Sequence, residues 1–222
     1  MPDLPLYIDA LFIITVFCAC YIFYRASNRD AVFIYVMAFW LLLQTVVSST
    51  GFYTVTQTFP PRFALLLGIP VLFIIGMFST NKGRVYIDSL DMKYLIMIHL
   101  VRIPVEIVLY LLFLYKKVPV GMTFEGANFD ILSGITALII VWLYHKKRLL
   151  SKKVLLVWNF MCLLLLLTIV VKAVFSAPFA FQQFAFEQPN VAVLYFPYVW
   201  LPCCVVPLVL FSHLAAIRKL LK

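Results

Sequence analysis

Charged residues are scarce in this sequence. Only 12% of its 222 residues are Asp, Glu, Lys or Arg, whereas 65% are hydrophobic, and the mean hydropathy is +1.05. Soluble globular domains carry about 25% charged and about 45–50% apolar residues. The composition therefore excludes a sizeable soluble domain. We predict that residues 1–222 form a single transmembrane domain.

The sequence also lacks the cysteine spacing of a thiol-based metal site or redox centre. None of its five cysteines belongs to a C-x-x-C motif. All five lie in apolar stretches, where cysteine behaves as a small hydrophobic residue. We therefore predict neither a metal site nor a cofactor.

Basic residues are missing from the N-terminal stretch MPDLPLYID. A secretory signal peptide begins with a basic region and ends at a small-residue cleavage site, and this stretch has neither. We therefore expect the first apolar stretch to be retained as a transmembrane helix. The net charge of +9 does not indicate nucleic-acid binding, because the Lys and Arg residues cluster in short connections between apolar stretches.

Apolar stretches of about twenty residues recur along the chain, the length with which a helix crosses ~30 Å of hydrocarbon. We predict an all-α polytopic membrane bundle of seven transmembrane helices, at residues 6–24, 32–51, 62–79, 92–115, 130–146, 153–175 and 191–216. Thirteen of the eighteen Lys and Arg residues then fall on one side of the membrane and three on the other. The positive-inside rule places the N-terminus outside and the C-terminus inside.

A polar stripe interrupts the fourth predicted helix, formed by His99, Arg102, Glu106 and Tyr110. At 100° per residue, these positions lie within an arc of about 80° on one helix face. Arg102 and Glu106 are four residues apart and can pair. Because lipid cannot satisfy charged side chains, the stripe must face the interior of the bundle. Pro104, within the stripe, removes a backbone donor and is expected to kink the helix.

More polar residues are predicted near the outer ends of neighbouring helices. The connection FEGANFD supplies Glu125, Asn128 and Asp130, and the sixth helix carries Lys172 near its outer end. One interpretation gathers them with the stripe around an outward-facing polar cavity. The other interpretations are local. Asn128 or Asp130 could cap the next helix, and Lys172 could extend to the interface or face Glu106.

Two further features concern the outer surface and the histidines. Residues 177–190 include the aromatic run FAFQQFAFE, which is too short and broken to cross the membrane. We expect this segment to be an interfacial lid packed on the bundle or a re-entrant segment. A haem held by two histidines would need them at matched depth. His99, His145 and His213 are predicted at unequal depths, which argues against haem.

One stretch resembles a known group of proteins. Residues 101–137 contain R-I-P-x-E, then M-T-F-E-G-x-N-F-D-I-L, then a G-x-T-A helix start. This stretch, about a sixth of the chain, resembles a family of uncharacterised bacterial multi-pass, seven-helix integral membrane proteins. The resemblance implies the bacterial inner (cytoplasmic) membrane and no particular activity. It also suggests that five polar residues form one constellation: Arg102, Glu106, Glu125, Asn128 and Asp130.

The leading hypothesis is that the protein binds or transports a small polar solute or ion through an outward-facing cavity. Arg102 would hold an anionic group or neutralise Glu106. Glu106 would be the protonatable partner, and His99 would extend a proton path toward the cytoplasm. The expected partners are the lipid bilayer, the solute and a second copy or another membrane protein, with nucleic acid excluded.

Two alternatives stay open. In the first, the protein is a non-enzymatic assembly, scaffold or sensory protein, and the Arg102–Glu106 pair is a structural tie. In the second, it is a membrane-embedded enzyme acting on a lipid or isoprenoid, with Glu106, Glu125 and Asp130 as acid–base or cation-binding groups. The sequence lacks the dense acidic motif expected of a Mg²⁺–diphosphate site. It therefore favours a protein without catalytic activity.

Overall fold

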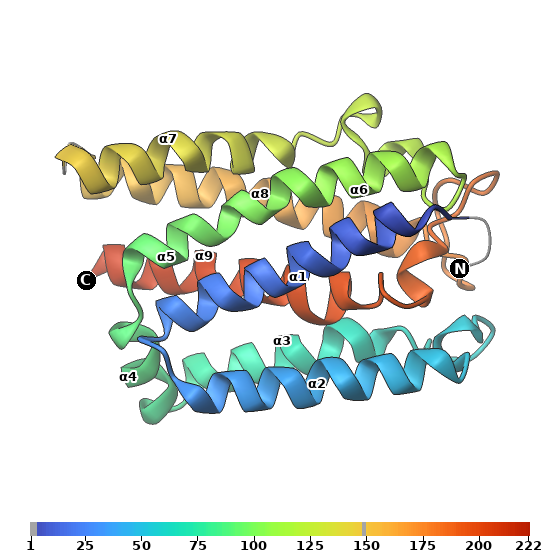
Figure 1. The fold of residues 1–222 in the computed structure, drawn as a ribbon, viewed down its shortest axis with the longest axis horizontal. Coiled ribbons are helices and arrows are strands. Elements are labelled where there is room, and N and C mark those ends of the chain that lie inside the picture. The colour runs from blue at the N-terminus through green and yellow to red at the C-terminus, as the bar shows by residue number, and fades with distance from the viewer. Residues whose placement is uncertain (1–3, 148–149) are drawn as a thin grey trace.

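A computed structural model describes residues 4–147 and 150–222, and within these residues the chain is helical with no strand. Most of the helices run along one long axis, and the two termini lie at opposite ends of the bundle (Figure 1). The helices are α1 (Leu6–Ala26), α2 (Ala31–Ser49), α3 (Ala64–Ser79), α4 (Asn81–Ser89), α5 (Met92–Met97), α6 (Arg102–Leu114), α7 (Ile131–Lys147), α8 (Lys152–Phe175) and α9 (Val206–Leu221). The predicted all-α class is confirmed.

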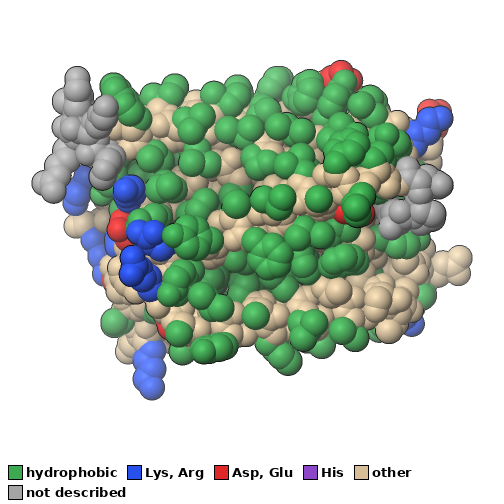
Figure 2. All heavy atoms as spheres, in the orientation of Figure 1, with side chains coloured by type: hydrophobic (Ala, Val, Ile, Leu, Met, Phe, Trp, Pro, Cys, Tyr) green, Lys and Arg blue, Asp and Glu red, His purple; other side chains and the backbone are tan. Residues whose placement is uncertain are grey.

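Within the described residues, five helical segments are long and apolar enough to cross a membrane: Leu6–Ala26, Ala31–Ser49, Met92–Leu114, Lys152–Phe175 and Leu201–Leu221. The α3–α4 pair is a sixth candidate, bent by 94°. The apolar part of α7, Ile131–Tyr144, is shorter. Hydrophobic side chains cover the long sides of the molecule in Figure 2. These features are those of a protein inserted in a membrane, with five to six candidate crossings.

The fourth predicted helix is continuous in direction but broken in its hydrogen bonding. A 3₁₀ turn at Ile98–Val101 separates α5 from α6, directly before Pro104. Proline has no backbone N–H, so the carbonyl of Leu100 loses its α-helical donor at residue 104. The backbone N–H of Arg102 contacts this carbonyl instead. Where a kink was predicted, the structure has this 3₁₀ turn within a segment that continues from Met92 to Leu114.

Gly134 allows α7 to approach this break closely. A Cβ atom at Gly134 would lie 2.7 Å from Cγ1 of Ile103 and 3.1 Å from its backbone nitrogen. It would also lie 3.3 Å from the carbonyl oxygen of His99. Only a residue without a side chain fits this contact. The contact brings the start of α7 beside the polar stripe.

The last predicted helix, at 191–216, is wrong in its position. The chain is irregular up to Trp200, forms a π-helical turn at Leu201–Val205 and continues as α9 to Leu221. Pro197 and Pro202 cannot donate helical hydrogen bonds, which opposes a regular helix across 191–202. Because the helix starts and ends later than predicted, His213 lies well inside it.

The α3–α4 bend places α4 across one end of the bundle (Figure 1). The side chain of Thr80 caps α4 by accepting a hydrogen bond from the backbone of Gly83. The sequence analysis treated this region as a connection. Its Lys and Arg side chains instead extend from a short helix at the cation-rich end of the molecule, seen at the left of Figure 2.

An ion-pair cluster joins α4 to the C-terminus of α9. Asp88 accepts hydrogen bonds from Nε and Nη2 of Arg218 at 3.0 and 3.1 Å, and it also pairs with Lys222. Lys219 donates to the backbone carbonyls of Asp88 and Leu90. The hydrogen bonds from Arg218, and then from Lys222, lower the pKa of Asp88 to about 2.

The first prediction concerns Gly134. We expect Gly134→Ala to lower the free energy of unfolding by about 1–3 kcal/mol, because the new methyl group overpacks against Ile103. Gly68→Ala, in α3, is the control, since a Cβ there meets nothing within 4 Å. That substitution should leave stability unchanged or raise it by about 1 kcal/mol. Thermal unfolding in detergent measures both, and equal effects would contradict the close approach.

The second prediction concerns acid pH and Asp88. Its pKa lies below the usual value of about 3.9, so its ion pairs stabilise the folded state above that value and lose their effect as the pH falls toward about 2. We therefore expect Asp88→Asn to lower the melting temperature by a constant amount near neutral pH. The difference from wild type should narrow as the solution becomes acidic. A difference that stays constant down to about pH 2 would refute this account.

Candidate functional site

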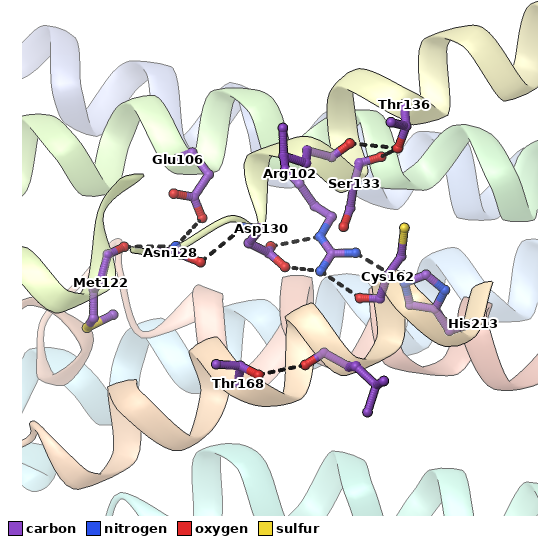
Figure 3. A network of polar contacts seen from close by, with 12 residues as sticks. Arg102, Glu106, Met122, Asn128, Asp130, Ser133, Thr136, Cys162, Thr168 and His213 are labelled. Carbon is purple, nitrogen blue, oxygen red and sulfur yellow. Dashed lines mark hydrogen bonds and ion pairs between the residues drawn. The ribbon is translucent and has the colours of Figure 1, made fainter. Parts of the chain in front are cut away.

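The centre of the candidate site is the buried guanidinium group of Arg102, in the first turn of α6. Arg102 is only 3% exposed. It does not pair with Glu106, four residues on, but with Asp130, at the start of α7. Its Nε atom donates to Oδ2 of Asp130 at 2.7 Å, and its Nη2 atom donates to Oδ1 (Figure 3). This two-point geometry is the strongest arrangement for an arginine–carboxylate pair.

The same guanidinium group contacts α8 and α9. Nη2 donates to the backbone carbonyl of Cys162 at 3.1 Å, and Nη1 lies 3.1 Å from Nε2 of His213. Arginine has no acceptor atom, so Nε2 of His213 must accept. The proton of this imidazole then sits on Nδ1, which lies 3.0 Å from Oδ1 of Asn159. The contacts thus fix a neutral tautomer of His213 and tie four helices together.

Glu106 lies beside this ion pair but is linked to it through Asn128. The side-chain amide of Asn128 donates to Oε1 of Glu106 at 2.7 Å and to the carbonyl of Met122 at 3.0 Å. Its carbonyl Oδ1 accepts from the backbone N–H of Asp130 at 3.1 Å. The other carboxyl oxygen of Glu106, Oε2, is buried without a hydrogen-bond partner. Glu106 is therefore the incompletely satisfied acid of the network.

A histidine pair lies on the opposite side of Arg102 from Glu106. The rings of His99 and His213 stack with centroids 3.8 Å apart and planes inclined by 18°. Trp158 packs edge-on to His99 at 5.4 Å and donates to the hydroxyl of Thr136 at 3.0 Å. His99 is fully buried, and neither of its ring nitrogens has a hydrogen-bond partner. The expectation that these two histidines lie at unequal depths is therefore wrong.

The remaining predicted residues lie outside the network. Tyr110 packs against Phe124, with ring centroids 4.9 Å apart. Glu125 is exposed on the connection before α7. Lys172 contacts the backbone of that connection instead of Glu106, since its ammonium group lies 3.3 and 3.2 Å from the carbonyls of Gly126 and Ala127.

The capping role considered for Asn128 and Asp130 is present only in part. Asn128 does bind a backbone N–H at the start of α7, but the carboxylate of Asp130 is directed to Arg102. A carboxylate at a helix N-terminus is also favoured by the helix dipole. The carboxylate of Asp130 thus interacts favourably both with the N-terminus of α7 and with Arg102.

Two members of the network, His213 and Asn159, were not predicted from the sequence. Asn159 is fully buried in α8 and also donates to the carbonyl of Leu155 at 2.9 Å. An amide inside an otherwise apolar membrane helix was an available signal, because such groups need partners inside the bundle. His213 was predicted at a different depth from His99 because the last helix was predicted too early in the chain.

The polar network is packed shut, unlike the outward-facing cavity that was expected. Network side chains line neither of two cavities that lie within the described part of the chain. The larger, of about 520 Å³, lies between α2 and α3 and has apolar walls. Within residues 4–147 and 150–222, no three His, Cys, Asp or Glu side chains are grouped so that they could hold a metal ion.

The third prediction concerns the Arg102–Asp130 pair. We expect Asp130→Ala to lower the free energy of unfolding by about 3–5 kcal/mol, because it leaves a buried guanidinium group without its counter-charge. In Arg102→Met/Asp130→Ala, the loss should be smaller than the sum of the two single losses. Lys172→Met is the control, with a loss below about 1 kcal/mol, since its ammonium group contacts two loop carbonyls at the edge of the bundle. Chemical unfolding in detergent measures all four variants, and strictly additive losses would refute the pairing.

Comparison with known proteins assigns a family. No curated protein and no solved structure matches the chain. A family model, Domain of unknown function (DUF8737), matches residues 60–221, which include every residue of the polar network. The chain belongs to this family of proteins with a domain of unknown function.

Proposed function

We propose that the protein binds a small polar solute or ion in a proton-linked manner at Glu106, as a step in moving it across a membrane. In this proposal the chain crosses the bacterial cytoplasmic membrane seven times. Its N-terminus and the α6–α7 connection lie outside, and its C-terminus lies inside. Glu106 is the titrating group, and Arg102 positions the residues around it.

The observation that carries the proposal is the buried, unpartnered Oε2 atom of Glu106. The positive charge of Arg102 is already balanced by Asp130, and the hydrogen bonds of His213 favour its neutral form. An ionised Glu106 would therefore leave one negative charge uncompensated inside the bundle, which is strongly unfavourable. A proton on Glu106, or a bound cation or hydrogen-bond donor, removes that penalty.

The α6–α7 connection is the route by which a solute would reach Glu106. Asn128 covers the Glu106 carboxyl group, and Lys172 holds the adjacent backbone through the carbonyls of Gly126 and Ala127. Ala127 has a φ of 61°, a left-handed conformation that costs an alanine about 1–2 kcal/mol. In this proposal, opening the segment over the acid breaks the contacts of Asn128 and Lys172 and relieves the left-handed conformation of Ala127.

Arg102 has a supporting role in this proposal and is not the ligand group. Four hydrogen bonds to Asp130, His213 and Cys162 already occupy its guanidinium group. An anionic solute would have to displace Asp130 to bind there. The proposal therefore moves the ligand from Arg102, where the sequence suggested it, to Glu106.

The satisfied guanidinium group also favours a second candidate, an assembly or scaffold protein without turnover. In that case the network holds α6, α7, α8 and α9 together. The unpartnered polar atoms of His99 and Glu106 then have no role in binding. The enzyme alternative receives less support. Glu125 is exposed and outside the network that contains Glu106 and Asp130, so the three acids do not converge.

The fourth prediction separates the two candidates at Glu106. Glu106→Gln keeps an oxygen that accepts from Asn128, so we expect it to fold with a stability loss below about 1 kcal/mol. Melting temperatures are measured at several pH values with a panel of anions, cations, amino acids and sugars. A solute that binds the folded state raises the melting temperature. We expect such an effect in wild type, dependent on pH, and its loss in Glu106→Gln.

Glu125→Gln is the matched control, since it makes the same chemical change on the exposed connection and should keep the wild-type response. If no compound in the panel stabilises wild type and the pH dependence of Glu106→Gln equals that of wild type, solute binding at Glu106 is excluded. The structural tie would then be the function of the network.

A further inference from the structure

An apolar cavity, called the slot below, lies between α2 and α3. These helices are consecutive in the chain, yet they pack on different neighbours. Phe33 of α2 packs on Phe23 of α1 with ring centroids 4.8 Å apart, whereas Phe78 of α3 packs on Phe211 of α9 at 5.9 Å. The space left between α2 and α3 is the cavity of about 520 Å³.

The walls of the slot are apolar and open sideways. Met37 of α2, Pro70 of α3 and Leu208 of α9 line it, together with Val36 and Ile69 at its edge. Val36 and Ile69 are 56% and 44% exposed on the face of the molecule that would meet lipid. Protein interiors are close-packed, and an empty space of this size forfeits the contacts of its lining atoms. An apolar occupant from the bilayer would restore those contacts.

The size of the slot selects among apolar occupants. One turn of an α-helix, about 10 Å wide and 5.4 Å long, already fills about 400 Å³. A transmembrane helix of a partner has about 20 residues and would therefore lie mostly outside the slot. Its wall on α2 extends from Val32 to Trp40, about 12 Å at 1.5 Å per residue. That length is close to half of the ~30 Å hydrocarbon thickness, so it suits one acyl chain in a single leaflet.

One end of the slot is polar and has exposed cations beside it. Asp30 and Tyr86 line that end. Arg29 is next to Asp30, and Lys82 lies one helical turn from Tyr86 on the same face of α4. Both cations are exposed. The α1–α2 connection and α4, which carry these two cations, lie at the same end of the bundle (Figure 1), where Lys and Arg side chains gather in Figure 2. Basic side chains at a membrane surface attract anionic headgroups.

We propose that the slot between α2 and α3 is a binding site for one anionic phospholipid. One acyl chain lies between Val36, Met37 and Ile69, and the phosphate contacts Arg29 and Lys82. The site is separate from the polar network, and its occupancy does not depend on the function proposed for Glu106.

The test counts the lipid molecules retained by the protein. Purified protein in mild detergent is mixed with equal amounts of phosphatidylglycerol and phosphatidylcholine that carry the same chains, and native mass spectrometry identifies what stays bound. We expect wild type to retain a single phosphatidylglycerol per chain. Val36→Trp/Ile69→Trp fills the slot and should reduce this retention about tenfold or more.

Two further variants make the test specific. Val157→Trp/Leu164→Trp adds the same side chains to the exposed face of α8, at residues 62% and 60% exposed, and should retain the lipid as wild type does. Arg29→Gln/Lys82→Gln should bind both lipids equally. Retention by the slot-filled variant at the wild-type level, or no preference of wild type for the anionic lipid, would overturn the proposal. A dimer that the slot-filling substitutions dissociate would assign the slot to a second copy instead.

Discussion

Burial of one arginine in a membrane bundle constrains the rest of this structure. A charged side chain at the centre of a bilayer costs at least about 2.5–3.5 kcal/mol, and Arg102 is 3% exposed. Its charge must be balanced and its donors satisfied within the protein. Asp130 supplies the charge, while Cys162 and His213 supply further acceptors. The packing of α6, α7, α8 and α9 follows from bringing these groups to one point.

Backbone irregularities make this convergence possible. The 3₁₀ turn before Arg102 and the absence of a side chain at Gly134 let the start of α7 lie against α6. The π-helical turn at Leu201–Val205 sets where α9 begins and therefore the depth of His213. Each feature would weaken an isolated helix. Together they position partners that a regular bundle of straight helices would keep apart.

The polar network and the apolar slot lie in different parts of the molecule. The network of α6–α9 is closed, hydrogen-bonded and centred on an ion pair, with Glu106 and His99 as its unsatisfied members. The α2–α3 side contains an apolar slot that opens sideways. The first region is suited to respond to a proton or a polar solute. The second is suited to hold hydrocarbon, because its apolar walls offer water no hydrogen-bond partners.

The sequence determined those features that depend on the hydropathy and charge of neighbouring residues. Blocks of apolar residues fixed the helical class and most helix positions, because a lipid-facing backbone must satisfy its own hydrogen bonds. The polar stripe was recognisable because Arg102 and Glu106 cannot face lipid. Their grouping with Asn128 and Asp130 was also accessible, since these two residues directly precede α7, the helix that follows α6 in the chain.

Tertiary structure decided the partners. Arg102 could pair with either acid by sequence, and the close approach at Gly134 selected Asp130. The stacking of His99 on His213 depended on where α9 starts, which prolines and a π-helical turn determine and apolar composition does not reveal. The slot arose because α2 and α3 pack on different neighbours. Such choices depend on contacts between segments distant in the chain, whereas the sequence by itself specified which side chains had to be buried and paired.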